Sequence, residues 1–318
     1  MKLGSIDISE GGILAPMAGI STVPFRRLCI EMQASLCVTE LVSGDALLRH
    51  TLRHRERIER APGEKILVGQ ILGRTPDQIA EAALTLEEEG CDAVDLNFGC
   101  PARKVVRNGG GSAFLKEPQR IGEAVKAATA RVKVPVSVKI RAGFDTGNPV
   151  AVEAAKYAAG EGAVAIFVHG RYREQIHSGP VHLDVIAAVK QAVAVPVVGN
   201  GGIRTLKDAN RMKAETGCDA VMIGQGAATN PWIFQEIRAG RASSRSAEEC
   251  IAAVTKLQGY YLEWAGPRRT SVEMRKFAAW MVRGLPGAVD FRRRLGEATT
   301  PEALLDLLHL VESPTKVD

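Results

Sequence analysis

Several common signals are missing from this chain of 318 residues. Its six cysteines form no CxxC pair, and no HExxH segment is present, so the usual motifs for a metal or dithiol site are lacking. No apolar run reaches the roughly 18 residues of a membrane span. The N-terminus also has no charged start followed by a long apolar run, as a secretory signal would. We therefore expect a cytoplasmic protein with reduced thiols and no metal.

The charge balance is mildly basic. Charged residues make up 24% of the chain, and the formal net charge is +5. Such an excess permits a polyanionic partner without requiring one. Hydrophobic residues make up 46%, which is enough for the core of one large domain and one small domain.

Short apolar runs rich in valine and isoleucine recur through the first two-thirds of the chain. We count eight, at residues 13–16, 36–40, 66–71, 93–97, 136–140, 165–170, 195–201 and 220–224. Segments of helical period separate most of them; in one, residues 75–90, Thr75 and Gln78 fit a capping box. Apolar strands alternating with helices predict a parallel sheet covered on both faces, and eight such units predict an α/β fold of the (β/α)₈ TIM-barrel type.

An internal repeat supports the barrel. The segments GCDAVDLN at 90–97 and GCDAVMIG at 217–224 share one local pattern, in which a glycine is expected to end a helix and a strand follows at once. Gly90 and Gly217 can adopt the left-handed conformation that such a helix end requires. The structural alternative, an open doubly wound sheet, explains less well why polar residues stand at so many strand ends.

The pattern changes near residue 240. A small, polar linker at 240–249 is followed by helical periodicity alone, at about 247–264, 271–284 and 301–312. We therefore expect the barrel at 1–240 and a small all-helical domain at 245–318. Between Arg268 and Arg294, eight basic residues stand against two acidic ones. This excess is compatible with a solvated helix face and with a surface for a phosphate backbone.

Polar residues and glycines stand where the predicted strands end, and catalytic groups of barrels gather at this edge. Any one of them alone is compatible with a structural role, but their agreement over many strand ends predicts an active site. Glycines after the seventh and eighth runs match the phosphate site of barrels, and Lys139, His169 and Gln70 offer donors for a planar ring. Flavin mononucleotide (FMN) meets both demands.

The motifs at these strand ends, taken together, resemble the tRNA-dihydrouridine synthase family, most closely its bacterial B type. They are APMAGISTVPFR, LNFGCPARKV, GGGSAFLKEP, VKIRAG, VHGR, GNGGI, AVMIGQGA and, near the C-terminus, MRKFAAWMVRGLPGAVDFRRRL. The resemblance covers the whole chain. It implies an FMN enzyme, with NADPH as the expected reductant, that reduces uridine in the tRNA D-loop to 5,6-dihydrouridine; the B type favours position 17. We expect a monomer.

The resemblance also implies roles for individual residues. Cys100 would be the catalytic acid. The FMN contacts would be Pro16, Met17, Ala18, Gln70, Lys139, His169, Asn200, Gly201, Gly202, Gly224 and Gln225. The uracil site would be lined by Asn97, Arg141 and Arg171, and the tRNA backbone would be held by the helical domain, through Arg268, Arg275, Lys276, Arg292 and Arg293.

The chemistry fits a thiol acid. While C6 of uracil receives hydride from the flavin, C5 needs a proton from the opposite face. A free thiol has a pKa of about 8.5, so it is mostly protonated near neutral pH and can still release its proton. Gly99 and Pro101 would fix the Cys100 loop, and Arg141 with Arg171 would stabilise charge on the uracil oxygens.

The sequence departs from the family pattern at two places. Gln225 stands where the family usually has an arginine for the FMN phosphate, and Arg204 is a candidate for the missing charge. In the loop at 170–179, Tyr172 replaces a threonine, and Ile176-His177 replaces Gly-Tyr.

Two alternatives remain open. The first is another FMN-barrel oxidoreductase acting on a free small molecule, which would not need an arginine-rich helical domain. The second is a catalytically silent RNA-binding barrel, against which the presence of Cys100, Lys139 and Arg141 argues.

Overall fold

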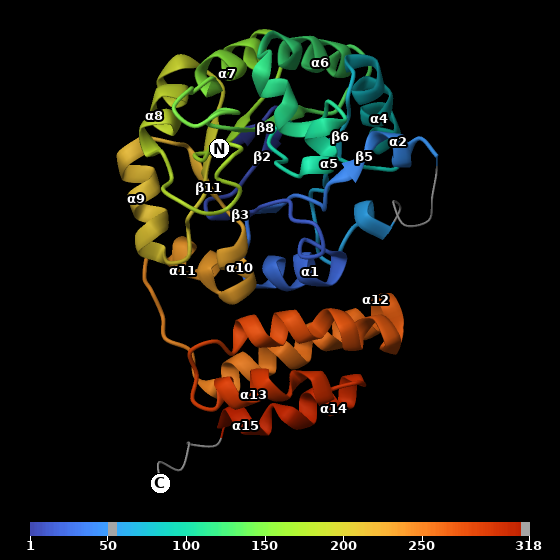
Figure 1. Ribbon diagram of the computed structural model, residues 1–318, viewed down its shortest axis with the longest axis vertical. Helices are drawn as coiled ribbons and strands as arrows, with labels where there is room; N and C mark the ends of the chain where they lie inside the picture. The colour runs from blue at the N-terminus through green and yellow to red at the C-terminus, as the bar shows by residue number, and fades with distance from the viewer. Residues whose placement is uncertain (50–55, 313–318) are drawn as a thin grey trace.

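Parallel strands form a closed barrel in the upper half of Figure 1. The structure is a computed structural model that describes residues 1–49 and 56–312. The sheet runs in the order β4-β3-β11-β10-β9-β8-β7-β6-β5. Its strands are β3 (Gly12–Leu14), β4 (Leu36–Cys37), β5 (Val42–Ser43), β6 (Val68–Leu72), β7 (Ala93–Asn97), β8 (Val136–Arg141), β9 (Ile166–His169), β10 (Val197–Asn200) and β11 (Ala220–Ile223).

The second barrel strand is interrupted. The sequence predicted one strand at 36–40, but β4 pairs with β3 and β5 pairs with β6, four residues further on. A parallel bridge between Val38 and Val68 joins the two edges. Since β4 and β5 are two pieces of one strand, the nine strands of the sheet make eight barrel positions, and the predicted (β/α)₈ fold is confirmed.

A short antiparallel hairpin, β1 (Lys2–Leu3) and β2 (Ile6–Asp7), precedes the barrel. Leu3 and Ile8 belong to the apolar cluster inside the barrel, together with Ile13 and Val198. The hairpin therefore covers the end of the barrel at which the strands begin, and it leaves the opposite end free for a site.

Helices surround the barrel on its outer face (Figure 1). They are α1 (Val23–Glu31), α2 (Gly44–Leu47), α4 (Pro76–Glu88), α5 (Arg103–Arg107), the 3₁₀ helix η1 (Gly111–Lys116), α6 (Gln119–Thr129), α7 (Ala151–Gly160), α8 (Leu183–Ala192), α9 (Leu206–Thr216), α10 (Gln225–Thr229) and α11 (Ile233–Ala239). Ile79, Ala83 and Leu86 of α4 are buried against the sheet, as their helical spacing predicts.

Helix ends follow local sequence rules, with one correction. The Thr75 hydroxyl accepts from the backbone N–H of Gln78, but the Gln78 side chain bonds the N–H of Arg74 and not that of Thr75. The predicted capping box at α4 is thus only half formed, because the side-chain amide reaches one residue further back. Gly90 and Gly217 have φ values of 87° and 67°, which confirms the predicted left-handed helix ends.

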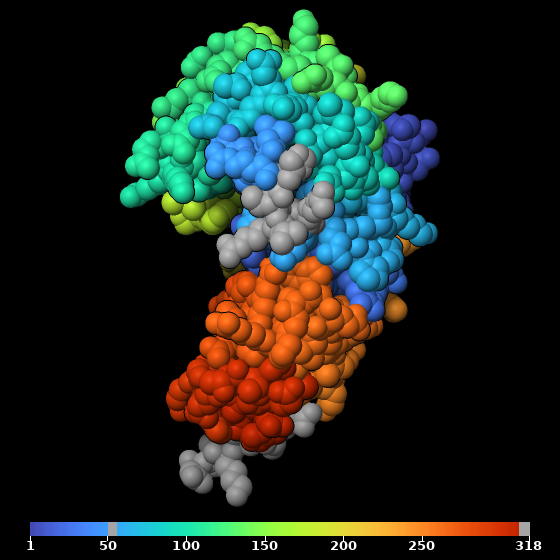
Figure 2. Space-filling view, turned by 90° about the vertical axis from the view of Figure 1, so that its right-hand side faces the viewer, coloured from blue at the N-terminus to red at the C-terminus, as the bar shows by residue number. Residues whose placement is uncertain are grey.

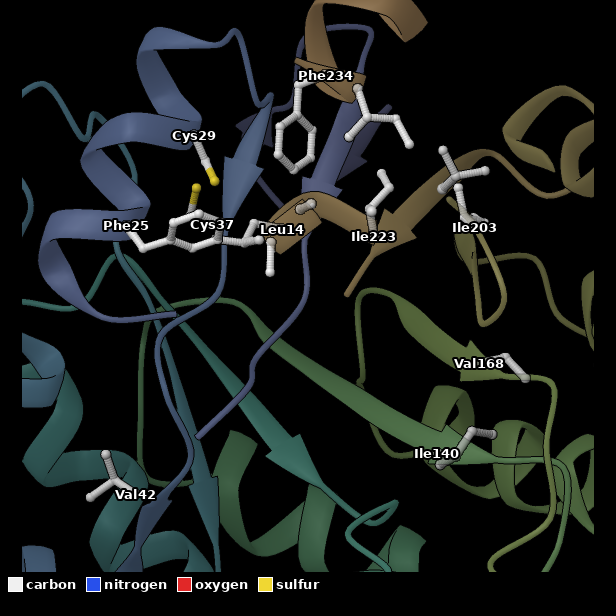
Figure 3. Packing of buried hydrophobic residues seen from close by; sticks show 14 of the residues in the cluster. Leu14, Phe25, Cys29, Cys37, Val42, Ile140, Val168, Ile203, Ile223 and Phe234 are labelled. Carbon is white, nitrogen blue, oxygen red and sulfur yellow. The ribbon is translucent and has the colours of Figure 1, made fainter. Parts of the chain in front are cut away.

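The main core lies between the strands and the surrounding helices. Figure 3 shows Phe25 and Cys29 of α1 beside Leu14 and Cys37, which are register partners on neighbouring strands. On another side, Phe234 of α11 packs close to β3 and β11: a Cβ added at Gly12 would lie 3.0 Å from its ring. Close packing of this kind fixes the barrel wall that carries the site.

The remaining helices form a separate lobe below the barrel (Figures 1 and 2). They are α12 (Ala247–Met281), α13 (Ala288–Arg294), the 3₁₀ helix η2 (Leu295–Glu297), α14 (Pro301–Leu307) and α15 (His309–Glu312). Gly266, with φ 70° and ψ 174°, kinks α12 just before Pro267. Within the described ranges, no helix has the length and apolar character that crossing a membrane requires.

The helical pattern of this lobe differs in detail from the sequence prediction. The gap expected after residue 264 is a kink inside α12, because Pro267 fits the first turn of the helix that follows. The helix α13 was not predicted, since its seven residues include three arginines and give too short an apolar period.

The helical lobe is attached to the barrel through α1. The rings of Phe25 and Phe277 lie 4.9 Å apart, and the hydroxyls of Thr22 and Tyr261 are 2.7 Å apart in a buried hydrogen bond. Because α1 directly follows the loop at the end of β3, this contact places the lobe beside the open end of the barrel.

The Phe277 contact yields a stability prediction. Truncating this fully buried ring in the Phe277→Ala variant should lower the free energy of unfolding by about 3–5 kcal/mol, because it leaves a cavity at the junction. Val272→Ala, on the same helix at a side chain 64% exposed, should change it by less than about 0.5 kcal/mol. Urea denaturation measures both; equal losses would contradict a role of Phe277 in joining the two parts.

Candidate active site

A cavity of about 790 Å³ opens at the C-terminal ends of the barrel strands. Its wall contains every barrel residue that the sequence predicted for the site. These are Pro16, Met17, Ala18, Gln70, Asn97, Cys100, Lys139, Arg141, His169, Arg171, Asn200, Gly201, Gly202, Gly224 and Gln225. The structure therefore brings together, from seven strand ends, residues that lie more than 200 positions apart in the chain.

Side chains inside the barrel change from apolar to polar toward this cavity. The N-terminal half of the interior is filled by Ile13, Leu36, Val68, Ala93, Ala165, Phe167, Val198 and Ala220. The following layer is polar: Gln70, Asp95 and Ser137 are cross-strand neighbours on β6, β7 and β8, and Asn97 pairs in register with Lys139. Buried polar groups need hydrogen-bond partners, so this layer is fixed by mutual contacts.

The loop that carries Cys100 is held by four hydrogen bonds to the side chains of three residues. The Asn97 side-chain oxygen accepts from the backbone N–H of Gly99 at 3.1 Å and of Cys100 at 2.9 Å. The Ser112 hydroxyl donates to the Cys100 carbonyl at 2.9 Å. Arg141 Nε donates to the Gly99 carbonyl at 2.7 Å. These bonds fix the backbone on both sides of the thiol at the cavity wall.

Lys139 occupies the floor of the cavity. Its ammonium donates to Asn200 Oδ1 at 3.0 Å, and Asn200 Nδ2 in turn donates to the Met222 carbonyl at 2.7 Å. Burial lowers the pKa of Lys139 to about 8, with a further decrease from the nearby Arg141 charge, while Asp95 acts in the opposite direction. The amino group is therefore a hydrogen-bond donor that loses its proton more easily than an exposed lysine does.

Positive charge dominates the cavity. Burial lowers the pKa of Arg141 to about 10, so the guanidinium still stays protonated at neutral pH. Burial, and then the charges of Lys139, Arg141 and Arg171, hold the pKa of His169 well below its ordinary value. His169 is thus a neutral imidazole among cations. Such a site favours a ligand that carries anionic groups or carbonyl oxygens.

A glycine turn forms one wall. Gly201 and Gly202 have φ values of +116° and +71°, and a Cβ at Gly201 would lie 2.7 Å from the His169 ring. A Cβ at Gly226 would lie 2.2 Å from the Ile203 carbonyl oxygen. Side chains are excluded at these positions, so the backbone itself faces the cavity. Left-handed turns of this kind present N–H groups to anions.

The loop after β9 forms the opposite rim. Ile176 has a φ of +52°, which is strained for a β-branched residue, and its side chain is 55% exposed. The neighbouring His177 ring stacks on His169 with centroids 6.5 Å apart. The loop thus places an apolar side chain at the rim despite the backbone strain. This segment is the one in which the sequence departs from the family pattern.

Further residues in the cavity wall were not predicted. They include Ile20, Leu41, Arg103, Ile203, Asp208 and Met222. Arg103 had a usable signal, since it lies three residues after Cys100 in the same loop. Ile20, Ile203 and Met222 lie within the quoted motifs but are apolar, so they gave no signal of a site. Leu41 and Asp208 lie outside the motifs, and their position follows from the closure of the barrel.

The predicted tRNA residues of the helical lobe lie outside the cavity. Lys276 faces the loop after β3, since its ammonium would lie 3.5 Å from a Cβ at Gly19, and it also pairs with Glu273 of its own helix. Arg275 donates twice to the Ala298 carbonyl and so ties α12 to the following helices. Arg293 pairs with Asp290 at 3.0 Å. In the described part of the chain, no ion pair involves Arg268 or Arg292, and both are exposed.

The fold and the cavity define a (β/α)₈-barrel protein with its site at the C-terminal strand ends, as in characterised barrel enzymes. A family model described as "Dihydrouridine synthase (Dus)" matches residues 13–315. The chain therefore belongs to the dihydrouridine synthase family. The family assignment predicted from the motifs is confirmed, and with it the prediction that the chain is an enzyme.

Similar curated proteins cover nearly the full chain. tRNA-dihydrouridine synthase B of Vibrio cholerae is 36% identical over 97% of this chain and 97% of its own. The protein of that name from Pseudomonas aeruginosa is 35% identical over 95% and 93%. A probable tRNA-dihydrouridine synthase of Rickettsia conorii is 36% identical over 96% and 94%. The B-type resemblance is thus confirmed.

Solved structures share the fold. Morphinone reductase in complex with tetrahydroNAD is similar with a TM-score of 0.55 and 13% identity, over 77% of this chain and 91% of that one. A 2-naphthoyl-CoA reductase is similar with a TM-score of 0.60 and 11% identity, over 76% and 52%. At such low identity, the likeness shows the barrel fold alone.

The placement of the thiols yields a second prediction. Five of the six cysteines are buried and Cys100 is partly exposed. Iodoacetamide should therefore alkylate one thiol per folded chain, and peptide mass spectrometry should locate it at Cys100. The Cys100→Ala variant should remain unlabelled; fast labelling at another cysteine would contradict this placement.

Proposed function

We propose that the protein is a tRNA-dihydrouridine synthase, as its relatives are named, that reduces the C5=C6 bond of a D-loop uridine, with position 17 favoured by the B-type resemblance of its motifs. One observation carries the proposal. A partly exposed thiol, two arginines and a glycine-lined wall meet in a single cavity at the strand ends. Such a cavity suits a planar cofactor with a phosphate and, above it, one pyrimidine.

The residues present fit FMN. The backbone at Gly201 and Gly202, where a side chain would clash with His169 or Val181, suits the phosphate. Lys139 and the neutral His169 suit the polar edge of the ring, and Gln70, Pro16, Met17 and Ala18 would line its remaining sides. When bound, FMN supplies the hydride for C6 of uracil.

At the phosphate end of the cavity, the positive charge is carried by a residue other than the one at position 225. Gln225 can donate a hydrogen bond there but carries no charge, so Gly224 and Gln225 would bind the phosphate through hydrogen bonds alone. Arg204 lines the same wall; burial lowers the pKa of Arg171, and the nearby Arg204 charge lowers it further. We assign to Arg204 the charge that Gln225 lacks.

Cys100 is the proton donor of the proposed reaction. Its thiol protonates C5 of uracil, while the backbone bonds from Asn97 and Ser112 keep the loop in place. Arg141 uses Nε and Nη1 for the Gly99 and Tyr172 carbonyls, which leaves further N–H groups for a uracil oxygen. Together with Arg171, it stabilises the negative charge that develops on the base.

The target base must leave its stack to enter the cavity. The helical lobe lies beside the open end, and Arg268 and Arg292 offer charges for the tRNA backbone. Arg275, Lys276 and Arg293 would contribute less, because each is already bound within the lobe. We expect NADPH as the reductant, a monomer, and a cytoplasmic location where tRNA is available.

The acid role of Cys100 is tested by its alanine variant. Cys100→Ala should bind FMN as the unaltered protein does, seen as visible flavin absorption, because the thiol lies on the substrate side. Its rate of dihydrouridine formation should fall by about 10²–10⁴-fold, since the general acid is lost. Mass spectrometry of the tRNA measures the product; full activity would remove the assigned role.

The tRNA surface is tested by charge reversal. Changing Arg292, Arg293 and Arg294 to Glu should weaken tRNA binding and reduce the slope of log K against log salt by about one per lost phosphate contact. Fluorescence anisotropy at several salt concentrations measures both.

A matched control keeps the same change of charge. Reversing Arg131, Lys133 and Lys213, which are exposed near the N-terminal ends of the strands, should leave the slope as it is, because this face is opposite the cavity. Equal slopes in the unaltered protein, the α13 variant and the control variant would assign the arginines of α13 to a solvated surface.

A further inference from the structure

A buried carboxylate lies below the cavity. Asp95 is fully buried on β7 and is absent from the cavity wall. Its two oxygens accept hydrogen bonds from the neighbouring strands: Ser137 Oγ donates to Oδ1 at 2.7 Å, and Gln70 Nε2 donates to Oδ2 at 2.7 Å. Burying a charge is costly, so such a residue needs a reason to be present.

The bond to Gln70 continues toward the cavity. Gln70 Oε1 accepts from Asn97 Nδ2 at 2.8 Å. Asn97 Oδ1 then accepts from the backbone N–H groups of Gly99 and Cys100. A continuous chain of hydrogen bonds thus runs from the carboxylate of Asp95 to the loop that carries the thiol.

The direction of this chain is set at both ends, because the loop N–H groups can only donate and the carboxylate can only accept. An ionised carboxylate only accepts hydrogen bonds, so Gln70 must turn its NH₂ group toward Asp95. Its oxygen must then face Asn97, which turns its own NH₂ to Gln70 and its oxygen to the loop. An amide side chain has two nearly isosteric orientations, and the carboxylate at one end and the loop N–H groups at the other select the same one for each of the two amides.

We propose that Asp95 is a positioning residue, which fixes the loop of Cys100 by fixing the orientation of the amides of Gln70 and Asn97. The proposal deepens the function above and rests on the role given there to Cys100. Without the charge, only the loop end still sets the direction, and the chain can reverse more readily. Asn97 would then present NH₂ to the N–H groups of Gly99 and Cys100, two donors would face each other, and the loop would be released.

The ionisation state agrees with this geometry. Burial raises the pKa of Asp95 to about 6, while its hydrogen bonds and the Lys139 charge act in the opposite direction. The carboxylate is therefore mostly ionised at pH 8, where a thiol assay is run. Its raised pKa means that the ionised form costs folding stability, so an uncharged replacement should not unfold the protein.

The test measures the rate at which iodoacetamide alkylates Cys100 at pH 8, in the full chain with excess FMN. Asp95→Asn keeps the shape but removes the charge, and should alkylate at least fivefold faster. Adding Asn97→Asp should return the rate to within twofold of the unaltered protein. The chain then runs in reverse, from the new amide at position 95 through Gln70 to a carboxylate that can only accept from the loop.

Ser137→Ala is the matched control, since it removes the other hydrogen bond of Asp95 without entering the chain, and it should alkylate at the unaltered rate. An unchanged rate in Asp95→Asn, or no rescue in the double variant, would overturn the proposal. If Asp95→Asn does not fold, the double variant decides alone: an unaltered rate supports the proposal and a faster one overturns it.

The alkylation rate is independent of the reaction catalysed. A protein that shows the predicted rates but forms no dihydrouridine keeps the positioning role and loses the proposed function. A protein that forms dihydrouridine while Asp95→Asn alkylates at the unaltered rate keeps the function and loses the positioning role.

Discussion

Polar side chains inside the barrel must satisfy one another, and the geometry of the cavity depends on this constraint. The five strands β6 to β10 each carry apolar residues near their start and a polar residue further along, so a dry packed layer lies below a hydrogen-bonded one. In that second layer, Lys139 is bonded to Asn200 and Gln70 to Asp95. Because each group is fixed by its partner, the cavity exists in the protein before a ligand binds.

The electrostatics of the site follow from the same burial. The pKa values of Lys139, Arg141 and His169 are all lowered, because each loses solvent and lies near other cations. Asp95 is the buried acid near Lys139, and it lies beneath the floor of the cavity. The cavity therefore attracts negative charge while its imidazole stays neutral, which suits a phosphate at one end and a developing enolate at the other.

Much of the fold was predictable because parallel strands and covering helices leave a repeated pattern in the sequence. The alternation of apolar runs predicted the barrel, and glycines such as Gly217 marked helix ends. The predictions were wrong where contacts with neighbouring segments, or the shortness of an element, outweighed the local sequence pattern. The second strand is split, the box at Thr75 is half formed, and the short helix α13 gave no apolar period.

The sequence by itself determined which residues stand at the strand ends, because the carboxyl ends of parallel strands meet at one edge. It also placed Cys100 between a glycine and a proline, in a loop with no packing reason for a thiol. Only the tertiary structure decided the contacts of Asp95, which in the sequence is an acid inside an apolar run. Its bonds to Gln70 and Ser137 join strands 25 and 42 residues away, and register between strands is a property of the closed barrel.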